Sequence, residues 1–309
     1  MTPLRALRSP ASGLALSLAA MLSACALGPD FSRPKPPQIA GYTGADTLPA
    51  TAGQRLKPAD ALPPAWWRAF GSPPLDDMVA LAVNGSPSLD SARATLAQAL
   101  ATTVAARGAQ YPQLDLKAGL AREQLQGVPG SFGPSASLFS VGPLVSFDPD
   151  PFGRIARGVE QQAALAEVQR YQLSVAYLTL TGNVVTEALT IASIRAQIAG
   201  VDEIVAVDRR NLELVRIAFE AGRSARLDVL TAESQLASDE TLLPPLRQQL
   251  SIARHALAVL LGKAPAEWSP PDLDLDAIAL PEELPLTLPS SLVRQRPDIL
   301  AAEAQLHAA

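Results

Sequence analysis

Apolar residues recur at every seventh position along two stretches of the chain that flank residues 221–224. The first series is Tyr177, Val184, Ile191, Ile198, Val205, Leu212 and Phe219, and the second is Val229, Leu236, Leu243, Leu250 and Leu257. This spacing is typical of helices that wind around one another in a left-handed coiled coil. No Pro interrupts residues 154–219, which would span roughly 100 Å as one helix. The pattern predicts a long antiparallel helical hairpin over residues 153–263.

A second periodicity, in which apolar and polar positions alternate, lies between residues 111 and 152. One face of the first run carries Leu114, Leu116, Ala118 and Leu120, and one face of the second carries Phe139, Val141, Val145 and Phe147. Such alternation predicts two β-strands, each with one apolar face, joined by the loop at residues 127–135, which is rich in Gly, Pro and Ser. Pro143 is unfavourable in the second strand because it removes a donor from the ladder.

Two interpretations of this strand pair remain open. Taken alone, the alternation favours a soluble hairpin. However, Phe139 and Phe147 would lie roughly 26 Å apart at about 3.3 Å per residue, which is close to the apolar height of an outer-membrane β-barrel with an aromatic residue at each rim. Two strands cannot close a barrel, and an open edge in lipid is very costly. The membrane interpretation therefore requires further strands from elsewhere.

The rest of the chain predicts shorter or less regular elements. Residues 75–110 predict a first helix, interrupted near Asn84–Pro87 because Gly and the residue before a Pro disfavour helix. Residues 25–74 form a Pro-rich extended segment, whose Trp66, Trp67 and Phe70 are expected to clasp the first helix. Residues 264–289 are expected to form a linker. Pro244–Pro245 predicts a kink or bulge in the returning helix.

An internal repeat is visible near the end of the chain. Pro87–Ala99 aligns without gaps on Pro297–Ala309, and the Pro, two Ala, one Leu and the final Ala coincide. Self-similarity of this kind indicates a repeated structural unit. We therefore expect residues 290–309 to begin a second copy, and the chain to be truncated before a second strand pair and a second helical hairpin.

Composition and motifs exclude several classes of function. The chain has 309 residues, a net charge of −5 and 5% aromatic residues, and it therefore lacks the basic and stacking surface that nucleic-acid binding requires. It has one Cys and two His, so the sequence predicts no zinc site and no Cys–His pair. Residues 148–159 resemble a Ca²⁺ loop only weakly, because Phe152 and Val159 occupy ligand positions. We expect no cofactor, no metal and no enzymatic activity.

The first 24 residues have the pattern of a secretory signal peptide. Arg5 and Arg8 precede an apolar run that is too short to span a membrane. The run ends in Leu22–Cys25, which resembles the lipobox of bacterial lipoproteins, where the Cys becomes the lipidated first residue. The alternative is an incidental or free thiol. Acyl chains such as palmitate on Cys25 would hold the protein on a bilayer, and the absence of Asp after Cys25 implies the outer membrane.

Together these features resemble the outer membrane efflux factor family, the TolC-like channels of tripartite efflux pumps, in its lipoprotein branch. The segments that carry the resemblance are Gly28–Pro34, Trp66–Gly71, Asp150–Arg154, Phe219–Arg223, Leu227–Leu230, Leu257–Gly262 and Leu288–Ile299. The departures are the extra prolines of Asp148–Pro151 and the absent second repeat, which puts channel formation by this chain alone in doubt.

The resemblance implies a mainly α fold with a β-hairpin. Its parts are a long antiparallel coiled-coil hairpin and two transmembrane β-strands, which make one half of a TolC-like α-barrel and β-barrel protomer. The full-length family member is a homotrimer in the outer membrane, with a periplasmic extension that meets a periplasmic adaptor protein and, through it, an inner-membrane efflux pump. The function implied is passive conduction of exported small molecules across the periplasm and outer membrane.

The resemblance also implies roles for particular residues. Ala221, Gly222, Arg223 and Ser224 would form the tip that contacts the adaptor, although Gly222 also suits a simple turn. Asp228 would face a constriction at the tunnel mouth, where convergent carboxylates select cations. It equally suits a solvated charge near a helix N-terminus.

Glu187 and Asp208 interrupt an apolar ladder and would either set the helix register or face the lumen. The alternative function is that of a periplasmic adaptor lipoprotein, which also combines a lipobox with a helical hairpin. Adaptors flank that hairpin with lipoyl-like half-motifs, whereas this chain flanks it with amphipathic strands.

Overall fold

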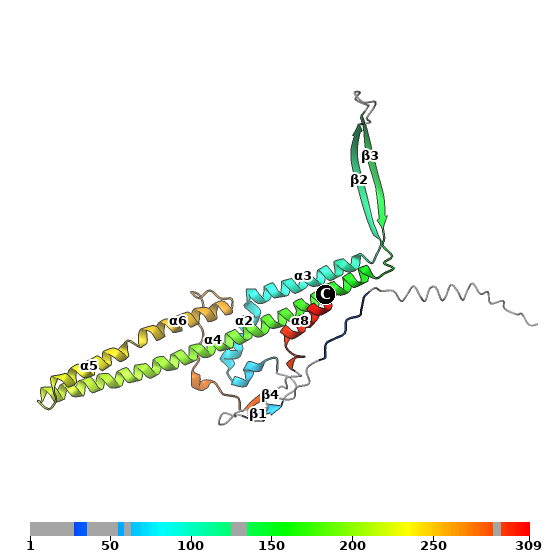
Figure 1. Cartoon of the computed structure of the whole chain (residues 1–309). Coiled ribbons are helices and arrows are strands. Elements are labelled where there is room, and N and C mark those ends of the chain that lie inside the picture. Colours follow the sequence, from blue (N-terminus) through cyan, green and yellow to red (C-terminus); the bar gives the residue numbers. More distant parts are fainter. Residues whose placement is uncertain (1–27, 36–54, 59–62, 125–134, 287–291) are drawn as a thin grey trace, which may run out of the picture. The chain divides into compact units, whose positions relative to one another are not determined.

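We describe a computed structural model of the chain for residues 28–35, 55–58, 63–124, 135–286 and 292–309 (Figure 1). The predicted signal peptide and Cys25 lie outside these residues. The described elements are β1 (Arg55–Pro58), η1 (Trp66–Phe70), α2 (Pro73–Gly85), α3 (Pro87–Gly108), β2 (Gln113–Gln124), β3 (Ser135–Ser146), α4 (Arg154–Glu220), α5 (Arg226–Glu240), α6 (Leu243–Leu260), η2 (Leu275–Ala277), β4 (Glu283–Leu286) and α8 (Pro297–Ala308).

The chain divides into two compact units, and helices α3 and α4 contribute to both. Unit 1 contains residues 1–34, 95–170 and 301–309, and unit 2 contains residues 35–94 and 171–300. Helix α4 is 67 residues long and has no break, as the uninterrupted heptad pattern predicts. The long helix and the β2–β3 hairpin confirm the predicted mainly α fold with a β-hairpin.

The heptad positions of α4 and α6 form the core of unit 2. Val184 and Leu257 are completely buried, and Ile191 and Val205 are nearly so. Helix α2 packs against them through the side chains of Leu75, Met78, Val79 and Ala82. Residues near 180–194 of α4 therefore have apolar partners from α2 and α6, which accounts for the burial of the first ladder.

The predicted aromatic clasp is present at the start of α2. Trp67 is buried, and its indole Nε1–H donates to Asp76 Oδ1 of α2 over 2.6 Å. Trp66 contacts both Trp67 and Phe70 edge to face. Burial of a Trp with its N–H satisfied is favourable because the ring leaves water without losing a hydrogen bond. The 3₁₀ turn η1 is therefore fixed on α2.

Two helix ends in unit 2 approach each other through their backbones. Helix α2 ends at Gly85, before Pro87 starts α3, as expected for the interruption in the first helix. Gly262, just beyond α6, has φ +69, and a Cβ on this residue would lie 2.0 Å from the carbonyl oxygen of Gly85. A Cβ on Gly85 would lie 3.1 Å from the carbonyl oxygen of Leu261. A side chain on Gly85 or on Gly262 would therefore require the end of α2 and the end of α6 to shift apart.

The returning arm of the helical hairpin is interrupted where two prolines were expected to break it. Helix α5 ends at Glu240 and α6 begins at Leu243, so that Pro244 and Pro245 lie in the first turn of α6. Pro is tolerated there because the first N–H groups of a helix have no intrahelical acceptor. The predicted kink is confirmed.

A short parallel ladder joins segments for which the sequence predicted no strand. Arg55–Pro58 of β1 pairs with Glu283–Leu286 of β4 in unit 2. The segment over residues 264–289, which was expected to form a linker, contains the short elements η2 and β4. It is also tied to η1, since the N–H of Ala279 donates to the carbonyl oxygen of Phe70.

Unit 1 contains the β-hairpin and the ends of three helices. Strands β2 and β3 pair antiparallel from Gln113↔Ser146 to Gln124↔Ser135. Helices α3 and α4 meet at Thr103, whose buried hydroxyl donates to the carbonyl oxygen of Gln162 over 3.0 Å. Pro143 stands opposite Leu116 within the ladder, so the chain accommodates this proline inside the strand.

Helix α4 is the one helix in the described part of the chain with a stretch apolar enough to cross a membrane by length and composition. Several apolar residues of α4 in unit 2 are buried against α2 and α6. Internal packing therefore accounts for part of this apolar character.

Candidate functional site

The first candidate region is the β2–β3 hairpin, whose register places the apolar residues of both strands on one face. The cross-strand pairs are Leu114↔Val145, Leu116↔Pro143, Ala118↔Val141 and Leu120↔Phe139. Leu116, Phe139 and Val141 are each more than three-quarters exposed. A row of apolar side chains left in water is unfavourable at about 25 cal/mol per Å². This face requires a partner or a lipid environment.

The opposite face of the hairpin is more polar and carries smaller side chains. Asp115 and Lys117 lie on it, together with Gly119, Ser140, Gly142 and Ser146. Leu138 and Leu144 interrupt this pattern. The hairpin is therefore amphipathic across its thickness, with one continuous apolar side and one side that suits contact with water.

The turn from β3 into α4 is shaped by two carboxylates. Asp148 accepts from the N–H of Asp150 over 3.0 Å and from Arg154 over 2.8 Å. The Asp150 N–H, followed by the Arg154 guanidinium, lowers the pKa of Asp148. Asp150 accepts from the N–H of Ala156 in the first turn of α4. Asp148 therefore fixes the turn, and Asp150 satisfies an N–H in the first turn of α4. No cluster of three metal-ligating side chains occurs in the described ranges.

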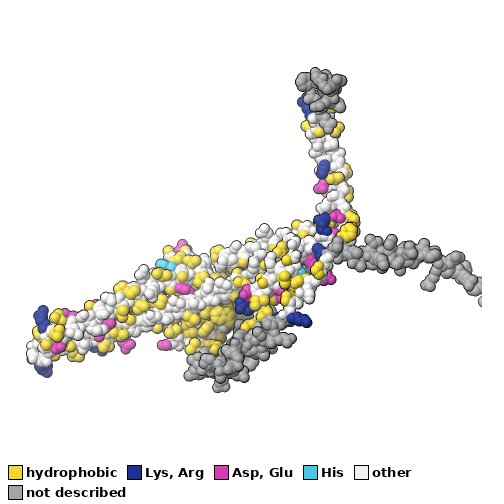
Figure 2. Space-filling view, viewed as in Figure 1, with side chains coloured by type: hydrophobic (Ala, Val, Ile, Leu, Met, Phe, Trp, Pro, Cys, Tyr) yellow, Lys and Arg dark blue, Asp and Glu magenta, His cyan; other side chains and the backbone are white. Residues whose placement is uncertain are grey.

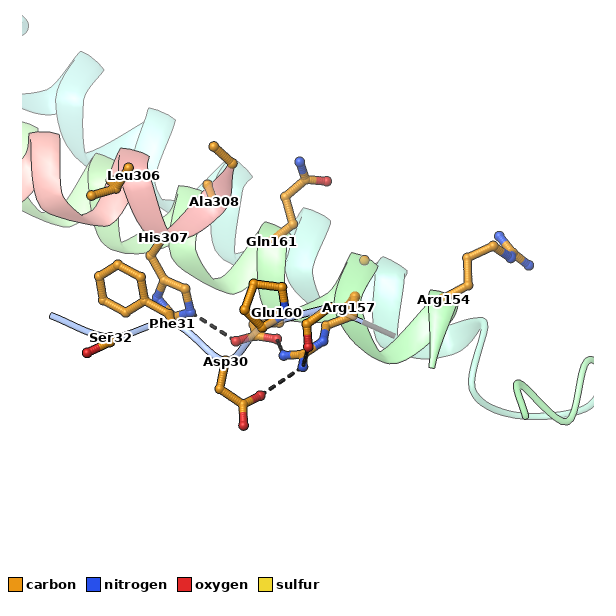
Figure 3. Close-up of a pocket in the computed structure, with 14 residues that line it drawn as sticks. Asp30, Phe31, Ser32, Arg154, Arg157, Glu160, Gln161, Leu306, His307 and Ala308 are labelled. Carbon is orange, nitrogen blue, oxygen red and sulfur yellow. Dashed lines mark hydrogen bonds and ion pairs between the residues drawn. The ribbon is translucent and has the colours of Figure 1, made fainter. Parts of the chain in front are cut away.

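A polar cluster in unit 1 holds Asp30 and Phe31, near the start of the described chain, against α4 and α8 (Figure 3). Arg157 donates to Asp30 over 2.8 Å and to Glu160 over 2.6 Å, and Glu160 contacts His307 Nε2 at 3.0 Å. The ring of Phe31 stacks on His307 with centroids 4.3 Å apart. The hydrogen bond from His307 and the Arg157 guanidinium lower the pKa of Glu160. Asp30 and Phe31 are therefore docked on α4 and α8.

The predicted tip of the helical hairpin is a complete Schellman turn. The N–H of Arg223 donates to Ala218 O and the N–H of Gly222 donates to Phe219 O, both over 2.8 Å. Gly222 has φ +70, a conformation that costs little only for Gly. A Cβ at this position would meet nothing within 4 Å. The tip is closed by its own backbone, and its outer surface is open.

Asp228 closes the other side of the same turn. Its Oδ2 accepts from the hydroxyl of Ser224 over 2.8 Å and from the N–H of Ala225, the N-cap residue of α5, over 2.9 Å. The Ser224 hydroxyl and then the Ala225 N–H lower the pKa of Asp228. The carboxylate therefore has a structural role at the tip, whatever else it faces.

We expect Asp228→Asn to loosen the tip. A folded-state pKa below the ordinary value means that the charged carboxylate stabilises the turn above about pH 4, and that this contribution is lost as pH falls through the folded pKa. Amide hydrogen exchange of Ala225 should show a protection factor that is several-fold lower in the variant at neutral pH. The difference should shrink at acid pH. Equal protection of Ala225 in both proteins would contradict this role.

Ion pairs connect the two arms of the hairpin at heptad spacing. They are Asp202–Arg247 at 3.8 Å, Arg209–Glu240 at 2.7 Å and Arg216–Glu233 at 2.6 Å. The sequence analysis missed them, although the same seven-residue spacing of opposite charges on both arms is visible in the sequence. Such pairs favour one register of the arms, because a slip would remove all three together.

The two acids that interrupt the apolar ladder lie in different surroundings. Burial raises the pKa of Glu187, which is partly buried in α4. The pKa of Asp208 is raised by a hydrogen bond with Asp239 of the returning arm, and also by burial. Asp208 therefore lies close to the opposite arm, which agrees with the register-setting alternative, and its place relative to a lumen stays a prediction.

Similarity to known proteins extends over nearly the whole chain. The family model described as outer membrane efflux protein matches residues 78–263. The fusaric acid resistance protein FusA of Burkholderia cepacia is 30% identical over 96% of this chain and 57% of its own length. The pyoverdine export outer membrane protein OpmQ of Pseudomonas aeruginosa is 31% identical over 79% of this chain and 53% of its own length.

A solved structure has the same fold. The outer-membrane channel OprN superposes with a TM-score of 0.79 at 28% identity, over 92% of this chain and 62% of that chain. The chain thus spans less than two thirds of the length of the relatives that it matches. The matching portion includes the strand pair and the helical hairpin. Because the family model covers more than half of the chain, the protein belongs to the outer membrane efflux protein family.

Proposed function

We propose that this chain supplies one half of a channel subunit of a tripartite efflux system, through which small molecules pass across the periplasm and the outer membrane. The observation that supports this most strongly is the β2–β3 hairpin, whose single apolar face is exposed from Leu114↔Val145 to Leu120↔Phe139. The family consists of transport proteins. Passage is passive in this proposal, and the pump supplies the energy.

The hairpin can lie in lipid only as part of a closed barrel. Two paired strands leave two open edges, and unsatisfied backbone groups in hydrocarbon cost several kcal/mol each. Strands from other copies, together with those of a second repeat, would pair with β2 and β3. A trimer of full-length subunits is therefore part of the proposal. The more polar face, with Asp115 and Lys117, would then line the water-filled interior.

The helical hairpin would reach into the periplasm and meet its partner at the tip. Residues 221–224 lie at its turn, and the open surface over Gly222 leaves space for another protein. We propose that a periplasmic adaptor contacts Ala221, Gly222, Arg223 and Ser224 and connects the channel to an inner-membrane pump. Asp228 would contribute to a cation-preferring constriction in addition to closing the turn.

The anchor belongs to the same proposal. Residues 1–24 would be removed as a signal peptide and Cys25 would carry the lipid, which adds roughly 0.8 kcal/mol of membrane affinity per buried CH₂ group. The docking of Asp30 on α4 and of Phe31 on α8 supports this arrangement, because Asp30 is held against the helix that follows β3.

The names of the relatives suggest different transported compounds. FusA is named for resistance to fusaric acid, and OpmQ for export of pyoverdine. Because relatives at similar identity carry such different names, the substrate class proposed here is no narrower than small exported compounds. The periplasmic adaptor alternative loses support, since the family model that matches is that of the outer membrane protein.

The proposal is tested with the full-length protein in two measurements. A Cys25→Ser variant should stay in the outer-membrane fraction and require detergent for extraction, because the barrel strands hold it there. Purified trimers in a planar bilayer should give discrete conductance steps, and Asp228→Ala should reduce cation preference if this acid lies at the constriction. A Cys25→Ser protein found in the soluble periplasmic fraction would contradict the channel and favour an adaptor.

A further inference from the structure

The three cross-arm ion pairs form a row with a spacing of seven residues, and the same spacing can be continued in the sequence beyond the first and the last pair. On α4 the paired residues are Asp202, Arg209 and Arg216, and on the returning arm they are Arg247, Glu240 and Glu233. One heptad further toward the tip, the same spacing reaches Arg223 and Arg226. One heptad further toward the base, it reaches Arg195 and Arg254. At the base, both positions lie in helices and arginine stands opposite arginine. At the tip, Arg223 lies in the turn after α4 and Arg226 is the first residue of α5, so two arginines lie close together in the sequence of the turn.

The base of the ladder shows how the protein neutralises such a pair. Asp272, from the segment after α6, forms ion pairs with both Arg195 and Arg254. Asp274 adds a second contact to Arg195 at 3.2 Å. A carboxylate from a third segment thus bridges two guanidinium groups that would otherwise repel each other. The three segments are locked together at this level of unit 2.

The tip pair has no equivalent carboxylate. Arg223 and Arg226 are both exposed, and neither forms an ion pair or side-chain hydrogen bond with any residue that the structure describes. Asp228 directs its carboxylate to Ser224 and Ala225 instead. Glu220, the other acid near the turn, forms no ion pair with either arginine in the described part of the chain. Basic side chains are visible at this end of the α4–α5 hairpin (Figure 2).

We propose that Arg223 and Arg226 form a docking point for acidic side chains of the periplasmic partner that meets the tip. This inference rests on the proposed function, and it names the chemistry of the partner surface. Asp or Glu residues of the adaptor would pair with these guanidinium groups, as Asp272, from a third segment, pairs with Arg195 and Arg254 at the base. Arginine suits this role because its planar fork binds carboxylates through paired hydrogen bonds. Arg226 was not among the residues that the sequence predicted for the tip.

Site-specific photocrosslinking in cells that carry the full-length protein tests the proposal. A photoreactive residue at Ala221 should crosslink to a periplasmic protein, and the crosslinked segment should contain Asp or Glu within about one helical turn of the contact. Arg223→Glu together with Arg226→Glu should lower the crosslink yield at least about fivefold, because it replaces attraction by repulsion. Changing the contacted acid to Lys should restore the yield.

Two control variants isolate the charge at the tip from charge elsewhere on the hairpin. Arg210→Ala removes a positive charge from α4 without breaking any ion pair of the described residues, and it should leave the yield within about twofold of wild type. Arg223→Lys with Arg226→Lys keeps the charges but loses the paired hydrogen bonds, so its yield should lie between those of the wild type and the charge-reversed variant. Trimer content measured for every variant shows whether the protein assembles.

The outcomes separate this inference from the function on which it rests. A crosslink to a segment without acids, or a yield that charge reversal leaves unchanged, would overturn the arginine docking point and leave the tip contact in place. Absence of any crosslink to a periplasmic protein from Ala221 would overturn the tip contact itself and this inference with it.

Discussion

Replacing Gly262 with Ala is expected to lower the free energy of unfolding by about 3 kcal/mol or more. Two effects add at this position. The φ of +69 places the residue in the left-handed region, where a Cβ costs roughly 1–2 kcal/mol. The new Cβ would also lie 2.0 Å from Gly85 O and 2.9 Å from Gly85 C. The contacted atoms are backbone, so relief requires α2 and α6 to move apart, at about 1–3 kcal/mol.

Gly222 provides a matched control within the same chain. It has φ +70 and ends α4 with the same Schellman geometry, but a Cβ there would meet nothing within 4 Å. Gly222→Ala should therefore cost only the conformational part, roughly 1–2 kcal/mol. Thermal unfolding followed by far-UV circular dichroism should rank wild type highest, Gly222→Ala next and Gly262→Ala lowest. Equal midpoints for the two variants would show that the contact between Gly85 and Gly262 contributes nothing to stability.

The sequence predicted the long elements well because their periodicity is sustained. Val184, Ile191, Val205 and Leu212 were assigned to one seam and are all buried. Gly222 and the prolines at 244 and 245 marked the turn and the break, because each has a local conformational preference that tertiary contacts do not override. The register of β2 and β3 agrees with the predicted apolar faces, since a slip by one residue would separate them.

Contacts between segments far apart in the sequence were not predictable in the same way. The ladder between β1 and β4 consists of two four-residue strands, too short to show a period and separated by most of the chain. The stack of Phe31 on His307 and the bridge from Asp272 to both arms depend on the folded arrangement alone. A single sequence contains no local signal for such pairs.

The candidate site was predicted in outline and refined by the structure. Gly222 was expected at the turn and is found there, and Asp228 was left between a capping role and a constriction. The structure shows the capping contacts, and the constriction stays a prediction. Arg226 and the charge ladder were not predicted, because an apolar periodicity contains no information about charged positions. The signal in the sequence is the seven-residue spacing of opposite charges on both arms, which corresponds to Arg209–Glu240 and Arg216–Glu233.

Replacing Val141 with Arg is expected to prevent most of the full-length protein from assembling in the outer membrane. Val141 lies near the middle of β3, opposite Ala118, on the exposed apolar face. If this face contacts lipid, an Arg near the bilayer midplane costs roughly 2–4 kcal/mol per subunit. In a trimer the same change occurs three times, so the total would be about 6–12 kcal/mol. Trimer content of outer-membrane fractions, measured by gel mobility with and without heating, should fall at least about tenfold.

Ser140→Arg is the matched control, because it introduces the same side chain one residue earlier on the opposite face of the strand. That face would line a water-filled interior, where an Arg remains solvated and should leave trimer content within about twofold of wild type. A soluble hairpin makes the opposite prediction, since an Arg at Val141 would then replace an apolar side chain that is unfavourably exposed to water. Wild-type trimer content of Val141→Arg would therefore refute the lipid-facing assignment, and the ratio between the two variants measures how strongly the two faces of the hairpin differ in their surroundings.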